Sequence, residues 1–338
     1  MTAKILDSFG GKLAEKWAAT LLTPAFVFWL GGFIAILQHW DWDRLVKKFS
    51  LYSAPLQTAI LVGCLCLIAA SAFVIQRFDW ITLRVLEGYY WPPVIGRIRV
   101  RHYELHRKQL VEQGQVLRQY EDKERHTFQR LKVKIETQGA SALSQADKEK
   151  YLQLDKQLLD SDKQSILMRT RRQLRNLPAV SDLMPTRLGN LIRATERRPL
   201  ARYGLDAVVC WPYLWLVIPD TAKRALQHAR SDLNSSARLC LWSLLFLSWV
   251  ALGAWWVIPI GILSALFAYY IWALAAARAY SDLIEAAFAL YRFELYEQLR
   301  WPLPSDPAAE RESGRALTAY LRQGSNQPYP QFVVSEDP

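Results

Sequence analysis

The chain has 338 residues, of which 51% are hydrophobic and 22% are charged, and its formal net charge is +11. These averages are typical of a soluble protein, but charged residues are absent from the windows 18–37, 55–76 and 239–277. Residues 76–236 contain 29 Lys and Arg against 18 Asp and Glu, so this block holds the whole net charge. This separation of charged from apolar segments excludes an evenly charged soluble enzyme, a disordered chain and a disulfide scaffold. It predicts an all-α, polytopic membrane protein with a cytosolic helical-hairpin domain inserted between two transmembrane hairpins.

The apolar windows predict four membrane spans. A helix needs about 20 apolar residues to cross the hydrocarbon core, and the first two windows each supply one such run. The third window is long enough for two spans, and we place the turn between them at 256–259. The transmembrane hairpins are thus expected at 18–76 and 237–279, after a cytosolic or interfacial helix over 1–17.

The distribution of Lys and Arg predicts the orientation of these spans. Basic residues precede the first span and follow the second, and the turn between the last two spans has none. Because cytoplasmic loops carry the excess of Lys and Arg, we expect both termini and the basic block in the cytosol. The outward loop 38–54 departs from this rule through Arg44, Lys47 and Lys48.

The basic block contains a predicted coiled-coil-like hairpin over 101–177, after a juxtamembrane helix over 77–100. In its first arm, apolar residues repeat at intervals of seven, a heptad-like spacing: Tyr103, Leu110, Leu117 and Leu131. A turn is expected near 138–143, and Ser144 with Asp147 forms a capping-box pattern that opens the second arm. The second arm repeats Leu152, Leu159 and Ile166 and ends before Pro178. Acidic residues alternate with basic ones throughout, which indicates solvated faces and disfavours nucleic-acid binding.

A basic cluster follows the second span. Anionic lipid headgroups attract such residues, so we interpret the cluster as a lipid contact. Its members are Arg97, Arg99, Arg101, Arg107 and Lys108.

The most distinctive motif lies within 178–236, a segment expected to form cytosolic or interfacial helices. It comprises Pro-Thr-Arg-Leu-Gly-Asn at 185–190 and Arg-Tyr-Gly-Leu-Asp at 202–206. This block resembles one in a family of uncharacterised bacterial membrane proteins. The resemblance implies a multi-pass protein of the bacterial inner membrane and carries no particular activity.

Two interpretations of this motif remain open. Arg187, Arg193, Glu196 and Asp206 are expected to form an ion-pair network below the bilayer, whereas an anion or nucleotide pocket would use the same arginines. In either case the coupling of the cytosolic domain to the spans is assigned to Arg187, Arg193, Arg202 and Asp206.

Three tryptophans are interpreted as interface anchors, because indole rings favour the headgroup level. The apolar run 207–219 is too short to span and carries Trp211. Trp91 and Trp301 each stand before Pro, four residues after Glu87 and Glu297 respectively, which indicates either duplication or convergence. The second of these motifs ends a cytosolic helix over 280–304, and a polar C-terminal tail is expected over 305–338.

Motifs for catalysis and cofactor binding are missing from the sequence. It contains no Gly-x-Ser-x-Gly, Walker A or His-Glu-x-x-His pattern, and His102 with His106 has no evident third metal ligand. We therefore expect no catalytic, metal or cofactor site. Small residues in the spans favour close packing and a homo-oligomer. The sequence favours a channel or pore-like effector controlled by the basic domain; the alternative is a membrane-anchored scaffold that recruits a cytosolic protein.

Overall fold

The computed structural model describes residues 23–38, 42–138, 144–158, 161–324 and 331–333, and all regular elements within these ranges are helical. The expected helix over 1–17 lies outside them. The helices are α2 (Thr23–Leu37), α3 (Trp42–Ser50), α4 (Ala54–Gln76), α5 (Asp79–Glu87), α6 (Pro93–Gln138), α7 (Gln145–Leu158), α8 (Ser161–Arg175), η3 (Val180–Asp182), α9 (Arg187–Tyr203), α10 (Ala207–Val217), α11 (Asp220–Phe246), η4 (Leu247–Leu252), α12 (Val257–Phe267), the π-helical η5 (Ala268–Ala273), α13 (Leu274–Gln298) and α14 (Pro307–Gln323).

Three helical runs are long and apolar enough to cross a membrane: Ala54–Gln76, Asp220–Leu252 and Val257–Gln298. The first predicted span begins outside the described residues, and its described part, α2, has 15 residues. The helices α11 and α13 run without a break through the positions where we placed the ends of the second transmembrane hairpin, 237 and 279. The apolar runs therefore continue directly into polar helix beyond them.

The last two runs are joined by a tight turn, as predicted, but it lies earlier than 256–259. Gly253 ends η4 with φ +74°, and α12 begins at Val257. Pro259 falls in the first turn of α12, where a proline costs no internal helical hydrogen bond. The positive φ of Gly253 is the conformation that glycine adopts without steric cost.

Small residues let α2 pack closely against the chain reversal. A Cβ atom on Gly31 or Gly32 would overlap the ring of Phe246 or Trp249, respectively. The Trp249 indole also donates a hydrogen bond to the Phe28 carbonyl oxygen over 3.1 Å. These contacts confirm the interpretation of this glycine pair as a packing site.

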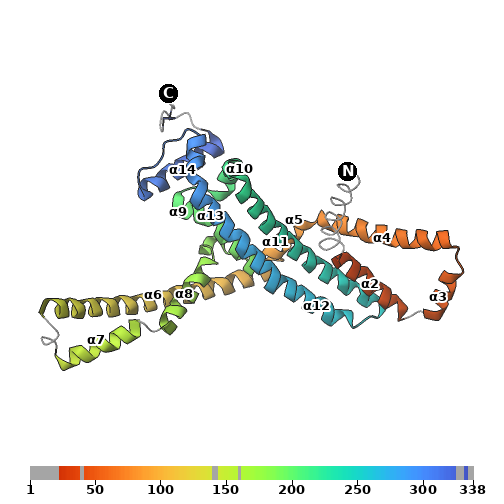
Figure 1. The fold of residues 1–338 in the computed structure, drawn as a ribbon, viewed down its shortest axis with the longest axis horizontal. Helices are drawn as coiled ribbons and strands as arrows, with labels where there is room; N and C mark the ends of the chain where they lie inside the picture. The colour runs from red at the N-terminus through yellow and green to blue at the C-terminus, as the bar shows by residue number, and fades with distance from the viewer. Residues whose placement is uncertain (1–22, 39–41, 139–143, 159–160, 325–330, 334–338) are drawn as a thin grey trace, which may run out of the picture.

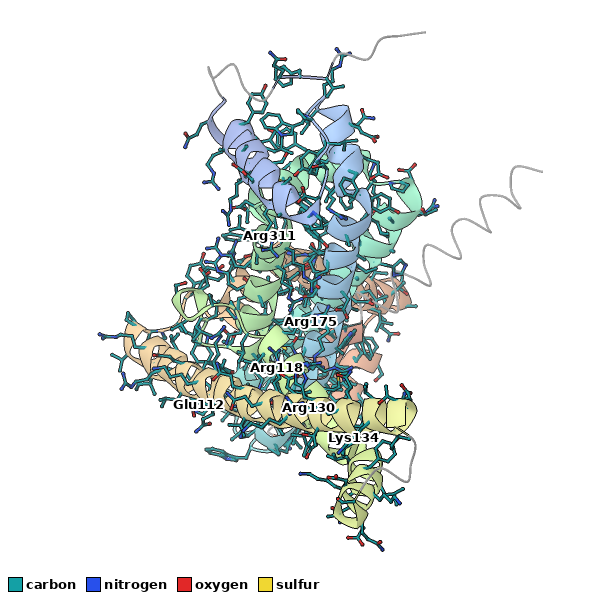
Figure 2. The ribbon with its side chains drawn as sticks, turned by 90° about the vertical axis from the view of Figure 1, so that its left-hand side faces the viewer. Glu112, Arg118, Arg130, Lys134, Arg175 and Arg311 are labelled. Carbon is teal, nitrogen blue, oxygen red and sulfur yellow. The ribbon has the colours of Figure 1, made fainter. Side chains whose placement is uncertain are left out.

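The long helix α6 pairs with α7 and α8 as a hairpin that points away from α3 and α4 (Figure 1). α6 begins at Pro93, after α5, and continues without a break through residue 100, where we placed the end of the juxtamembrane helix. Charged side chains cover the hairpin, including Arg118, Arg130 and Lys134 (Figure 2).

The predicted seam is partly buried in the first arm of the hairpin, where Tyr103, Leu110 and Leu131 are buried and Leu117 is half-buried. In the second arm Leu152 and Ile166 are 60% and 49% exposed, and Leu159 lies outside the described residues. The buried residues described in that arm are Leu154, Leu167 and Thr170. The predicted cap is present, since the Asp147 backbone N–H donates to Ser144 Oγ over 3.2 Å.

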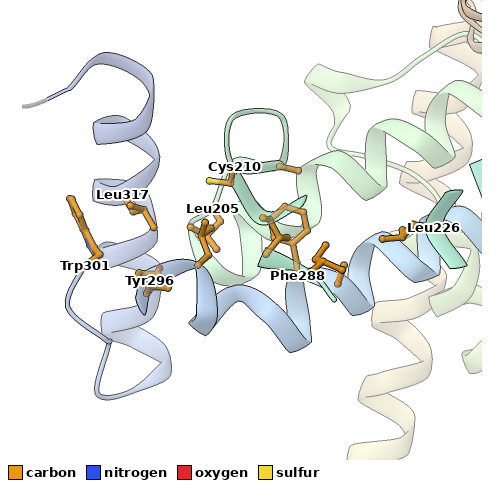
Figure 3. Packing of buried hydrophobic residues seen from close by; sticks show 12 residues of the cluster. Leu205, Cys210, Leu226, Phe288, Tyr296, Trp301 and Leu317 are labelled. Atoms are coloured by element: carbon orange, nitrogen blue, oxygen red, sulfur yellow. The ribbon is translucent and has the colours of Figure 1, made fainter. Parts of the chain in front are cut away.

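The expected polar tail instead begins with a packed helix, α14. Asp306 caps this helix by accepting hydrogen bonds from the Ala308 and Ala309 backbone N–H groups over 2.8 and 2.9 Å. Leu317 is fully buried. A hydrophobic core joins α14 to α10, α11 and α13 (Figure 3), and its labelled members are Leu205, Cys210, Leu226, Phe288, Tyr296, Trp301 and Leu317.

Helix α9 lies at the centre of the polar half of the molecule and contacts α5, α10, α13 and α14. Its buried residues include Leu188, Leu191, Ala194 and Thr195. At its N-terminus, a Cβ atom on Gly189 would overlap the Glu87 carbonyl oxygen. The backbones of α9 and α5 are thus in direct contact.

We predict that Gly189→Ala destabilises the protein by about 1–3 kcal/mol, because the added methyl group meets backbone atoms that cannot move aside alone. Thermal unfolding of the purified protein in detergent measures the change. Gly96→Ala in α6 is the matched control, since a Cβ atom there meets nothing within 4 Å. The control should be neutral or stabilising by about 0.5–1 kcal/mol, and equal effects of the two substitutions would contradict the packing argument.

Candidate functional site at the base of the hairpin

The 185–190 motif builds the start of α9. Thr186 Oγ1 accepts a hydrogen bond from the Gly189 N–H over 2.9 Å and donates one to the Glu87 carbonyl oxygen over 2.8 Å. The Asn190 amide accepts from the Met184 N–H and donates to the Met184 carbonyl oxygen, both over 2.8 Å. These bonds satisfy backbone groups that a helix start leaves unpaired. The residue types of the motif are therefore explained by the docking of α9 on α5.

The same end of α9 contacts the π-helical segment η5. The Arg187 guanidinium carbon lies 5.8 Å from the centroid of the Tyr270 ring, a cation–π geometry. The Leu188 N–H donates to Tyr269 Oη over 3.5 Å. A π-helical turn inside an α-helix is rare and often marks a functional site. Arg187, one of the predicted coupling residues, thus lies against the point where the α12–α13 helix changes geometry.

Three helices meet at the Glu285 carboxylate of α13. Arg198 of α9 forms an ion pair with it, and Arg175 of α8 lies 3.0 Å from its Oε2 atom. Arg202 lies 4.0 Å from the same oxygen, and Arg175 also contacts Asp282 over 3.1 Å. Figure 2 shows Arg175 where the second arm of the hairpin meets the body of the protein. We call these five residues the Glu285 cluster.

The Glu285 cluster holds three guanidinium groups and two carboxylates. The Glu285 side chain is 10% exposed and that of Arg198 is 14% exposed. Burial lowers the pKa of Arg198 to about 10, and the neighbouring Arg175 and Arg202 act in the same direction. This pKa is still far above neutral, so Arg198 stays charged at neutral pH, and the three guanidinium groups of the cluster share only two carboxylates.

The predicted four-residue ion-pair network is wrong as a unit. Arg193 does pair with Glu196 over 3.3 Å, but Asp206 pairs with Arg322 of α14 over 3.1 Å. Positions 187 and 193 are six residues apart on α9, and a rotation of about 100° per residue places them on different faces. Arg187 therefore meets Tyr270 instead of the carboxylates.

The 202–206 motif forms the corner between α9 and α10. Gly204 ends α9 with φ +76°, and a Cβ atom there would overlap the Arg311 carbonyl oxygen of α14. Asp206 caps α10 by accepting a hydrogen bond from the Val208 N–H over 2.9 Å. The motif thus fixes α10 and α14 relative to α9.

The residues predicted to contact lipid divide into two groups. Arg99 Nε donates to the Pro185 carbonyl oxygen over 3.3 Å, and Arg107 Nε donates to that of Pro178 over 3.0 Å. These two side chains tie α6 to the segment before α9. The other members of the cluster, Arg97, Arg101 and Lys108, are exposed.

The three tryptophans interpreted as anchors occupy different environments. Trp91 donates to the Val85 carbonyl oxygen over 2.9 Å, and Trp211 is half-buried against Phe288. Trp301 is only 4% exposed and donates to Ser313 Oγ over 3.2 Å. Its position follows from packing against α14, and the different surroundings of Trp91 and Trp301 favour convergence over duplication.

The residues that the sequence reasoning missed are Glu285, Asp282, Arg175 and Arg198. Arg175 and Glu285 are 110 residues apart, and no local pattern links them. The one available signal is the pair Asp282 and Glu285, which share a face of a helix that continues an apolar run.

In the described part of the chain, no group of three His, Cys, Asp or Glu side chains is placed to hold a metal ion. Comparisons with models of protein families, with curated proteins and with solved structures find no match. The resemblance of the 185–206 block to bacterial membrane proteins therefore stays a prediction.

We predict that Glu285→Gln destabilises the protein by about 3 kcal/mol, because removal of one partner leaves the buried Arg198 charge without its counter-ion. Chemical unfolding in detergent measures this change. Hydrogen exchange should also rise in α8, which keeps only the Arg175–Asp282 ion pair with α13. Asp220→Asn is the control, since its side chain is 88% exposed in a surface pair and its loss should cost about 0.5 kcal/mol or less. An unchanged stability of Glu285→Gln would show that the cluster does not hold α8 to α13.

Proposed function

We propose that this chain is a non-enzymatic integral protein of the bacterial inner membrane that acts as an oligomeric channel or pore-like effector controlled by its basic helical domain. In this proposal α2, α4, α11 with η4, and α12 cross the bilayer. The hairpin of α6, α7 and α8 extends into the cytosol, and both termini lie on that side.

The amphipathic helix α3 supports this orientation. It joins α2 to α4 at the end of the molecule opposite the hairpin (Figure 1). Trp42, Val46 and Phe49 are exposed, and Lys47 and Lys48 lie in the last turn. A helix with exposed apolar residues and lysines suits a position in the plane of the headgroups. Its lysines then contact lipid at the outer surface, which accounts for the departure of loop 38–54 from the charge rule.

The Glu285 cluster is the observation that carries the proposed control. Through it, the second arm of the hairpin and α9 hold α13, and α13 continues through η5 into the last apolar run. Arg187 holds α9 against η5 itself. A displacement of the hairpin would thus reach the membrane through one continuous helix.

The surface of α4 supports assembly from several copies. Among its 23 residues only Ala72 is buried, and α4 packs mainly along α2. The rest of this apolar surface is available to lipid or to another copy of the chain. A cavity of about 250 Å³ between α2, α11 and α12 is lined mostly by apolar groups, with Ser243 and Ser264 hydroxyls 2.8 Å apart. Such a lining suits a pore that is gated by dewetting.

The scaffold alternative is favoured by exposed apolar residues on the hairpin. Leu152, Ile166, Met168 and Val133 are 49–62% exposed. A surface of this kind on a helix pair suits a partner helix. A cytosolic protein, or the hairpin of a second copy, would cover it.

For the topology, we predict that a single cysteine at Val133, introduced into a cysteine-free variant, is protected from a membrane-impermeant thiol reagent in intact cells. A cysteine at Lys48, in the last turn of α3, should be labelled. Both side chains are exposed, so membrane sidedness decides the difference. Labelling of the Val133 position before cell lysis would show that the protein has the opposite orientation to the one proposed.

For the activity, we predict single-channel currents from the purified protein in planar bilayers, with an open probability that depends on Arg187 and Tyr270. Arg187→Gln and Tyr270→Leu should each change it about two- to fivefold, since a cation–π contact at an exposed site contributes ~0.5–1 kcal/mol. Arg118→Gln, on the exposed hairpin, is the control and should leave gating unchanged.

Mass photometry in nanodiscs should find more than one copy per particle, and the variants should assemble like the wild-type protein. An absence of current at all voltages, together with a cytosolic protein captured by the hairpin and lost in Leu152→Glu, would establish the scaffold instead of the channel.

A further inference from the structure

A cavity of about 280 Å³ lies between α5, α9, α10, α11 and α13. Trp80 and Val208 are 57% and 67% exposed at its rim. The helix α5 starts three residues after the apolar helix α4 ends, so in the proposed topology the cavity lies at the cytosolic headgroup level. Its volume is at the lower end of ligand pockets, ~300 Å³, which suits a small polar group better than a whole lipid.

The charged groups that line the cavity are balanced. They are Arg84 and Glu87 of α5, Glu196 of α9 and Arg230 of α11. This balance differs from the positive excess of the surrounding block. Arg84 pairs with Glu87 over 3.8 Å, and Glu196 pairs with Arg193 over 3.3 Å. A simple anion or a simple cation would therefore compete with one charge of each pair and leave the other without its partner, which is costly away from bulk water. A zwitterion carries one positive and one negative group, so it can meet both the two carboxylates and the two guanidinium groups.

Glu87 lacks a close counter-ion. The residue is 8% exposed, and its ion pair with Arg84 spans 3.8 Å, which is longer than a hydrogen bond. Burial raises the pKa of Glu87, and Glu196 acts in the same direction, while Arg84 and Arg230 oppose it. A ligand with N–H donors would stabilise the carboxylate form.

The aromatic side chains indicate which kind of ammonium group fits. The Arg84 guanidinium lies over the Trp80 ring at 5.5 Å, and that of Arg230 lies over the Tyr280 ring at 5.6 Å. A quaternary ammonium group needs several free aromatic faces, and two of the three aromatic residues lining the cavity already pair with arginine. A primary ammonium group instead donates hydrogen bonds to carboxylates.

We infer that this cavity binds a phosphate ester of a primary amine, which is the headgroup chemistry of phosphatidylethanolamine. The ammonium group lies between Glu87 and Glu196, and the phosphate contacts Arg84 and Arg230. The lipid as source rests on the proposed membrane insertion, whereas a soluble phosphoethanolamine ester has the same chemistry without it.

The test is native mass spectrometry of the delipidated full-length protein with equimolar phosphatidylethanolamine, phosphatidylcholine and phosphatidylglycerol of identical acyl chains. Phosphatidylethanolamine should bind about tenfold more tightly than either of the others, as expected for one hydrogen bond between charged groups. Glu87→Gln and Glu196→Gln should each remove the preference. Val208→Trp should weaken binding by filling the rim, and it changes an exposed residue, so the fold is retained. The control is Glu297→Gln, which neutralises an exposed glutamate of α13 and should keep the preference.

Competition by soluble glycerophosphoethanolamine would identify the headgroup alone as sufficient, and its failure would identify the lipid as the ligand. Equal binding of the three lipids, a preference for phosphatidylglycerol, or a preference that survives all three cavity variants would overturn the inference. Flotation with liposomes after carbonate washing tests insertion separately. If the protein floats with liposomes but shows no preference for phosphatidylethanolamine, only the proposed headgroup site is refuted. If the protein does not float, the proposed membrane insertion is refuted.

Discussion

Direct backbone contact at the two ends of α9 is the constraint on which the rest of the polar half depends. Gly189 touches the end of α5, and Gly204 touches α14. A side chain at either position would push α9 away from α5 or from α14. Because α5 follows α4 and α13 follows α12, α9 links the polar continuations of two apolar runs, in addition to the contacts that α2 and α12 make with α11. This arrangement explains why the two glycine motifs flank a single helix.

Charged pairs accumulate just beyond the apolar runs. Asp79 of α5 meets Arg238 of α11 over 3.1 Å, and both side chains are less than 20% exposed. Arg292 of α13 meets Glu310 of α14 in a similarly buried pair. Such pairs add little net stability. However, sliding one helix of a pair along the other would leave both charges unpaired, which costs free energy. The Glu285 cluster differs because three arginines share its acceptors, so its contacts are easier to exchange.

The parts of the fold that could be predicted from the sequence are those set by local pattern. The apolar runs, the reversal near Gly253, the helical hairpin and the cap at Ser144 all follow from composition or short spacings. Leu152 and Ile166 were wrongly assigned to the seam because the buried positions described in this arm, such as Leu154 and Leu167, lie one or two residues further along, and a ragged heptad does not fix the phase. The helix α14 was missed because its few apolar residues, such as Leu317, become a core only when α10 and α13 cover them. The sequence singled out the motif arginines, but Arg187 and Arg202 meet partners more than 80 residues further along the chain, Tyr270 and Glu285, and no spacing rule links them.

The π-helical segment shows how tertiary contact overrides local sequence in this protein. Residues 268–273 contain neither glycine nor proline, so nothing in their composition favours a widened turn over a regular α-helix. Outside its own helix this segment packs against α11, and it also meets α9 through Arg187 on Tyr270 and the Leu188 N–H on Tyr269. A widened turn has fewer favourable contacts within the helix and depends more on such external partners. The geometry of the last apolar run is therefore tied to the position of α9, and α9 is tied in turn to the hairpin through Arg198, Arg175 and the Glu285 carboxylate.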